Sequence, residues 1–146
     1  MEIHRYERIW LITGVAILAA FLIVLGVNAF AMGQMPPSHM EQVDAQTVRM
    51  TAPFSQPGVY QVGANEYEVV MLGYMFGFAP NHVEIPQGAT VHFTITTPDV
   101  VHGFFIPGTT VNMMLLPGYV SHYSYTFDKA GEYLMLCNEY CGIGHQ

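Results

Sequence analysis

An uncharged apolar run near the N-terminus constrains this chain more than any other feature. From Ile9 to Met32 the sequence reads IWLITGVAILAAFLIVLGVNAFAM, 24 residues without an acidic or basic side chain. A helix of that length spans about 36 Å, which exceeds a hydrocarbon core of about 30 Å. The sequence therefore predicts a transmembrane helix over residues 9–32, preceded by a short segment over residues 1–8.

A cleaved signal peptide is the alternative, because Ala29, Phe30 and Ala31 have the small-x-small form of a cleavage site. The hydrophobic region of a signal peptide normally has about 7–15 residues, so the length of this run favours a retained anchor. Arg5 and Arg8 precede the run, and the positive-inside rule therefore places residues 1–8 in the cytoplasm. Either interpretation puts the remaining residues outside the cytoplasm, and the anchor makes membrane lipid a partner.

Charge is unevenly distributed along the chain. From Gly33 onward there are nine acidic and two basic residues, and these account for the whole net charge of −7. An acidic surface disfavours binding to nucleic acid and attracts a basic protein partner. Keeping a domain soluble is the simpler reason for most of these charges.

Residues 33–65 contain several Pro, Gly and Asn without a sustained period, which predicts a linker. From Glu66 the pattern becomes that of short strands. Val91, Phe93 and Ile95 alternate with polar residues, which is typical of a strand with one buried face. Strands separated by turn residues predict an all-β sandwich over residues 66–146, with strands expected at 66–72, 82–88, 89–97, 119–127 and 131–137.

The C-terminal segment CNEYCGIGHQ contains the only two cysteines, Cys137 and Cys141, followed by His145. Two cysteines outside the cytoplasm can form a disulfide, which is one interpretation. The other is a metal site, because His102 stands at a second predicted strand edge and thiolate with imidazole suits copper or zinc. Zinc knuckles place their ligands closer together in sequence, whereas two thiolates on one loop are suited to bridging two copper ions.

The segments FGFAPNHVEIPQG, DVVHGFFIPG, LLPGYVSHYSYTFDKAGEY and CNEYCGIGH together resemble subunit II of the haem-copper cytochrome c oxidases, most closely the B-type branch. This resemblance implies a cupredoxin-like Greek-key sandwich carrying the dinuclear copper centre CuA, in a bacterial or archaeal cell membrane. It implies bridging roles for Cys137 and Cys141, one copper ligand each from His102 and His145, and an axial ligand from the backbone carbonyl of Glu139.

The resemblance also implies a function. The chain is expected to accept electrons from a cytochrome c or similar donor and to pass them to haem in subunit I, where oxygen is reduced to water. Phe76 matches an aromatic residue where electrons are thought to enter, although an ordinary core aromatic is the alternative. A haem-copper nitric oxide reductase uses the same kind of subunit and is the second functional hypothesis. A membrane-anchored copper chaperone or thiol redox protein is the third.

One departure from the family pattern concerns the C-terminus. The family pattern continues with a methionine three residues after the last histidine and then a final strand, whereas this sequence stops at Gln146. Truncation of the sequence is expected, because a missing strand leaves an open sheet edge beside the metal loop.

Overall fold

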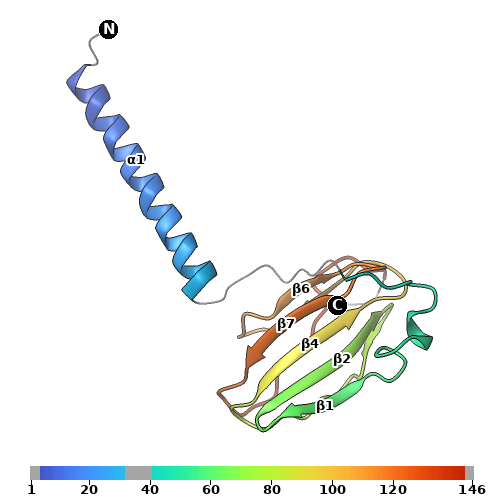
Figure 1. The fold of residues 1–146 in the computed structure, drawn as a ribbon. Helices are drawn as coiled ribbons and strands as arrows, with labels where there is room; N and C mark the ends of the chain where they lie inside the picture. Colours follow the sequence, from blue (N-terminus) through green and yellow to red (C-terminus); the bar gives the residue numbers. More distant parts are fainter. Residues whose placement is uncertain (1–3, 32–40, 144–146) are drawn as a thin grey trace. The chain divides into compact units, whose positions relative to one another are not determined.

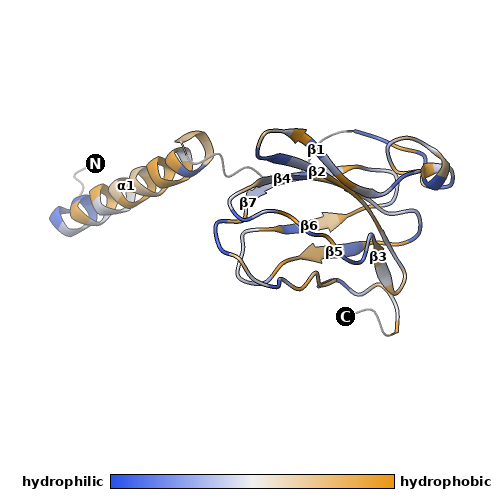
Figure 2. Ribbon diagram, turned by 90° about the horizontal axis from the view of Figure 1, so that it is seen from below, coloured by the Kyte–Doolittle hydropathy of each residue, from blue (hydrophilic) through white to orange (hydrophobic). Residues whose placement is uncertain are grey.

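The computed structural model describes residues 4–31 and 41–143, which fall into two compact units divided between Pro36 and Pro37. In the first unit, helix α1 (Arg5–Gly26) continues into a single π-helical turn over Val27–Ala31. The most apolar window of this 27-residue helical stretch has a mean hydropathy of 2.6, and its side chains are not buried by protein. The helix is therefore long and apolar enough to cross a membrane, as Figure 2 also shows by its hydropathy.

The second unit is built of two β-sheets, which confirms the predicted all-β class (Figure 1). In the larger sheet the strand order is β1-β2-β4-β7, with β3 paired to β2; a separate pair consists of β5 and β6. Strands β2 and β4 run parallel, and the other pairs are antiparallel. The strands are β1 (Gly58–Gly63), β2 (Glu66–Tyr74), β3 (Gly77–Ala79), β4 (Thr90–Thr96), β5 (His102–Phe105), β6 (Asn112–Leu115) and β7 (Ser121–Thr126).

The main core lies between the two sheets, seen edge-on in Figure 2. Alternate residues of β2 and β4 point into it, as the period-2 pattern of β4 predicts. Phe104 of β5 is fully buried there and packs against the rings of Phe78 and Phe93, with centroids 5.3 Å and 5.4 Å away. Members of this core from the two sheets include Val69, Met71, Val91, Phe93, Ile95, Phe104, Met113 and Leu115.

The structure corrects the linker predicted for residues 33–65. Val48 and Phe54 are fully or almost fully buried, and they pack with Val70, Leu72 and Val120 in a second cluster. Strand β1 pairs along β2, and a short 3₁₀ helix covers Val48–Met50. The prediction failed because the segment has no period, although two isolated apolar side chains suffice to anchor it. Residues 33–40 of the predicted linker lie outside the described residues.

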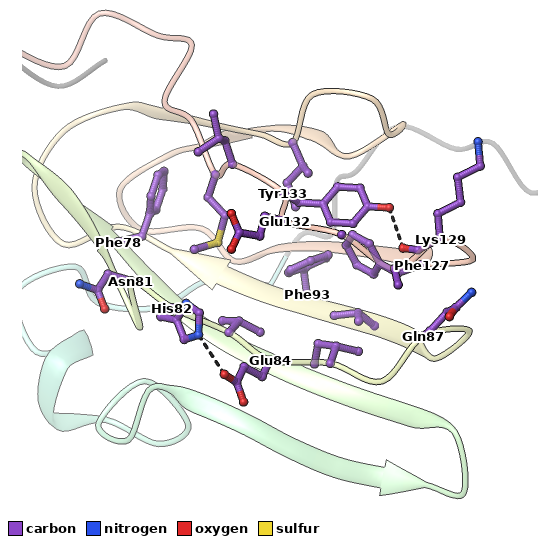
Figure 3. A pocket seen from close by; sticks show the side chains of 18 residues that line it. Phe78, Asn81, His82, Glu84, Gln87, Phe93, Phe127, Lys129, Glu132 and Tyr133 are labelled. Atoms are coloured by element: carbon purple, nitrogen blue, oxygen red, sulfur yellow. Dashed lines mark hydrogen bonds and ion pairs between the residues drawn. The ribbon is translucent and has the colours of Figure 1, made fainter.

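Two of the predicted strands are also wrong. Residues 82–88 and 131–137 do not form sheet ladders within the described part of the chain; Leu136 makes an isolated bridge to Phe105. These two segments flank a cavity of about 800 Å³ with an apolar floor that includes Phe93 and Phe127 (Figure 3). Alternation predicts which face is apolar but not whether a partner strand lies alongside. Conversely, the bounds of the short strands β5 and β6 were not predicted, although a strand edge was expected at His102.

Candidate metal centre

Three side chains that are far apart in sequence meet at one end of the second unit. His102 is the first residue of β5, and Cys137 follows the Leu136 bridge to Phe105 of the same strand. Backbone hydrogen bonds of 2.9 Å in both directions between Phe105 and Leu136 fix that juxtaposition. The ligand atoms of His102, Cys137 and Cys141 all lie within 4.8 Å of one another. Three of the four residues predicted as ligands within the described chain are therefore brought together, and the fourth is Glu139.

The two sulfur atoms are close but form no disulfide. The Sγ atoms of Cys137 and Cys141 lie 3.4 Å apart, well beyond a disulfide length of about 2.05 Å. The Gly103 N–H donates to the Cys137 sulfur at 3.4 Å, and the backbone carbonyl of Glu139 lies 3.4 Å from the same sulfur. The structure therefore presents a thiol pair with the Glu139 carbonyl turned toward it.

Asp99 orients the imidazole of His102. Its carboxylate oxygen Oδ1 lies 2.8 Å from Nε2 of His102, while Nδ1 of the same ring faces the Cys137 sulfur at 3.9 Å. A carboxylate at Nε2 favours the tautomer that carries its proton there, which leaves a lone pair on Nδ1. The histidine is thus held with its donor atom toward the sulfurs.

The Asp99 carboxylate is strongly stabilised in its ionised form. Partial burial alone would raise its pKa, but hydrogen bonds from Met75, His102, Val100 and Thr97 outweigh this and lower the pKa to about 2. The group therefore remains an acceptor for the His102 ring over the whole physiological range of pH.

The Cys141 thiol has a raised pKa, in contrast to the lowered pKa of Asp99. Burial raises its pKa to about 11, with further contributions from the neighbouring Cys137 and the negative charge of Asp99. In the metal-free protein this thiol is therefore protonated near neutral pH. A metal that binds to it has to displace the proton.

We expect the metal-free chain to lose stability as pH rises from 9 to 11. The folded-state pKa of Cys141 is raised from 9.0, so the unfolded chain ionises first and gains relative stability over this window. The free energy of unfolding below pH 9 is therefore higher than at pH 11 by about 2 kcal/mol, because the buried Cys141 thiol is neutral there. Urea unfolding at pH 8 and pH 11 measures it. The Cys141→Ala variant controls for tyrosine and lysine ionisation, and an identical pH dependence in both proteins would contradict the assignment.

Gly103 permits the close approach of β5 to the loop between the cysteines. A Cβ atom at this position would overlap the side-chain oxygen of Asn138 and lie 2.9 Å from its backbone nitrogen. The Asn138 amide also donates to Asn112 at 3.1 Å, which ties the loop to β6. Gly103 therefore sets the distance between His102 and Cys137.

We expect Gly103→Ala to displace the loop and to destabilise the domain by about 1–3 kcal/mol. Unfolding free energy and metal content of the purified chain measure the two effects. Gly58→Ala is the matched control, because a Cβ at Gly58 would meet its nearest atom at an ordinary 3.6 Å. Equal behaviour of the two alanine variants would show that the close approach at Gly103 is unimportant.

Two further predicted site residues are His145 and Phe76. His145 lies outside the described residues, so its predicted role as a ligand stays a prediction. The Phe76 side chain is 62% exposed, so it is not a core aromatic. Asp99 and Gly103 were not predicted as site residues. They lie three residues before and directly after His102, and their contacts with the cluster are formed only in the folded domain.

The buried cluster suits a soft metal ion. Two sulfurs and one imidazole nitrogen are donors typical of copper and zinc, and the three side chains are 0–7% exposed. The nearby cavity of Figure 3 includes none of these residues and is a separate feature. The donor set, its spacing and its burial therefore fit the copper that the family resemblance implies.

Comparison with known proteins agrees with the resemblance. A sequence model of the cytochrome c oxidase subunit II periplasmic domain matches residues 75–146. A Thermus thermophilus protein named cytochrome c oxidase subunit 2 is 46% identical over 148 residues, covering 99% of this chain and 88% of the relative. This chain belongs to the cytochrome c oxidase subunit II family. A second Thermus thermophilus subunit 2 sequence is 49% identical over 116 residues, covering 78% of this chain and 86% of the relative.

A solved structure supports the same family. A chain of a haem-copper terminal oxidase dimer, determined by cryo-electron microscopy, matches with a TM-score of 0.80 and 30% sequence identity. The match covers 97% of this chain and 93% of the other. The cupredoxin-like fold predicted for subunit II is therefore confirmed, and the chain is one component of an oxidoreductase complex.

Proposed function

We propose that this chain is the electron-accepting subunit of a haem-copper terminal oxidase and carries a dinuclear copper centre. The observation that carries the proposal is the buried cluster of His102, Cys137 and Cys141, with its ligand atoms within 4.8 Å of one another. Cys137, Cys141, His102, His145 and the backbone carbonyl of Glu139 would hold the copper. When bound, the copper pair supplies one-electron redox chemistry.

The protein's own residues prepare the site for that role. Asp99 holds the His102 ring with Nδ1 toward the sulfurs, so that little reorientation is needed on binding. Both thiols lose their protons when metal binds, so copper uptake releases protons. Burial of the three side chains excludes water from the donor atoms.

The proposed partners follow from surface and sequence. The acidic domain suits a basic soluble donor such as a cytochrome c, and the exposed Phe76 lies in the turn beside the cluster. By the positive-inside rule, Arg5 and Arg8 favour an orientation with residues 1–8 in the cytoplasm and the domain on the outer face of the membrane. The chain then passes electrons to haem in subunit I, where oxygen is reduced to water.

A thiol redox protein is a poorer explanation of the same cysteines. A reactive thiol has a lowered pKa and is accessible to its substrate. Here Cys141 is 4% exposed and its pKa is raised to about 11, mainly by burial. These properties favour a protected metal ligand over a dithiol catalyst. Nitric oxide as the final acceptor depends on the catalytic subunit, and the relatives' names favour oxygen.

Copper analysis of the assembled oxidase tests the proposal. We expect two copper ions per copy of this chain and a mixed-valence paramagnetic spectrum in which one unpaired electron is shared by both ions. Replacement of His102 with alanine should remove that signal while the haem spectra of subunit I persist. A complex with full oxidase activity but no copper in this subunit would overturn the proposal.

A further inference from the structure

The turn between β2 and β3 contains an unusual backbone conformation. Phe76 has a φ of 75°, and it is the only non-glycine residue with a positive φ among residues 4–31 and 41–143. For a bulky side chain this conformation is strained and persists only where surrounding contacts fix it. The preceding residue, Met75, is also exposed, so burial does not supply that restraint.

Pairing of Tyr74 with Gly77 closes this turn, and Asp99 restrains it further. Its second carboxylate oxygen, Oδ2, accepts a hydrogen bond of 2.7 Å from the backbone N–H of Met75. Its first oxygen, Oδ1, accepts from the Thr97 hydroxyl at 2.8 Å, the Val100 N–H at 2.7 Å and the His102 ring at 2.8 Å. One carboxylate therefore contacts the strained turn with one oxygen and the metal-ligand histidine with the other.

The turn and the metal loop are also in contact by another route. A Cβ atom placed on Gly142 would lie 3.7 Å from the Met75 sulfur, so the turn packs beside the residue that follows Cys141. Asp99 is thus hydrogen-bonded to His102, and the turn that it contacts packs beside Gly142, the residue after Cys141. The Asp99 side chain is 25% exposed, so these bonds are partly shielded from water.

We propose that Asp99 is a positioning residue that links the His102 ligand to the Phe76 turn, so that one side chain aligns both the metal centre and the exposed aromatic beside it. The inference rests on the proposed function, because it assigns the turn to the route by which electrons reach the centre.

The Asp99→Asn variant separates the two contacts. Three donors face Oδ1 and one faces Oδ2, so the carbonyl oxygen of the introduced amide should occupy the Oδ1 position. Its NH₂ group would then face the Met75 N–H, donor against donor, and that hydrogen bond is lost. The variant should therefore keep the His102 ring in place and release the turn. Asp99→Ala should release both.

The experiment compares these variants as full chains in the assembled oxidase. For Asp99→Asn we expect copper to be retained and amide hydrogen exchange at Met75 to be faster by about tenfold, as loss of a charge-assisted hydrogen bond implies. For Asp99→Ala we also expect an altered copper spectrum and copper affinity lower by about 10–100-fold, as for loss of a ligand's outer partner. Asp128→Asn, which removes the same charge at an exposed position, should leave both readouts unchanged.

A cycle with Phe76→Ala tests the functional link. If Asp99 acts through the turn, adding Phe76→Ala to Asp99→Asn should slow electron uptake less than Phe76→Ala does in the wild type. Unchanged Met75 exchange in Asp99→Asn, or fully additive effects on electron uptake, would overturn the inference. Absence of copper from the wild-type subunit would instead overturn the proposed function, so the two failures are distinguishable.

Discussion

Replacing Cys137 with serine is expected to abolish the copper centre. The Cys137 sulfur lies 3.4 Å from the Cys141 sulfur and 3.9 Å from Nδ1 of His102, so it occupies the middle of the donor set. A serine hydroxyl is a hard donor that is protonated at neutral pH, and it cannot bridge two soft ions. We expect copper content to fall to background and electron uptake by the complex to stop. Metal analysis and electron paramagnetic resonance of the purified oxidase measure the loss.

Tyr140→Ser is the matched control for this variant. Tyr140 belongs to the same loop between the cysteines, but its side chain is 87% exposed and does not belong to the donor cluster. Copper content should therefore remain at the wild-type level. A Cys137→Ser protein with two copper ions and an unchanged spectrum would exclude Cys137 as a bridging ligand.

Phe104→Ala is expected to have the largest effect on stability. The side chain is fully buried between the two sheets, beside the rings of Phe78 and Phe93. Truncation of a buried phenylalanine costs about 3–5 kcal/mol, which is a large part of the roughly 5–15 kcal/mol that stabilises a typical domain. For a domain of this size the melting temperature should fall by at least about 12 °C. Thermal and urea unfolding of the metal-free chain in detergent measure the change.

Phe76→Ala provides the contrast within the same residue type. Its ring is 62% exposed, so its truncation should change the unfolding free energy by less than about 0.5 kcal/mol. The same variant should slow electron uptake in the assembled oxidase. Equal destabilisation by the two alanine variants would contradict the described core.

The sequence predicts the parts of this protein that depend on local pattern. Val91, Phe93 and Ile95 alternate in β4 as expected, and the apolar run at residues 9–31 forms the expected helix. The candidate ligands Cys137 and Cys141 were identifiable because cysteine is scarce and the resemblance is specific. The glycine, proline and asparagine residues between positions 41 and 65 predicted a linker. Val48 and Phe54 nevertheless anchor this segment, because they pack against Val70 and Leu72 of β2.

Pairing between distant segments was not predictable in the same way. Residues 82–88 and 131–137 carry strand-like patterns, but a ladder needs a partner that a local pattern does not specify. Strand β5 has only four residues and begins at His102, so the sequence indicated a strand edge there but not the bounds of the strand. The importance of Asp99 arises because the turn at Met75 folds back on the segment before His102, a contact that spans 24 residues.

The bridge between Phe105 and Leu136 has a consequence for biogenesis. It joins segments separated by about thirty residues, so His102 and Cys137 come together only after most of the domain has been synthesised and folded. Asn138, Glu139 and Tyr140, which lie between the two cysteines, are nevertheless exposed at the surface. Under the proposed function, copper delivery should therefore follow folding, and a delivery protein could reach this exposed loop while the sandwich stays intact.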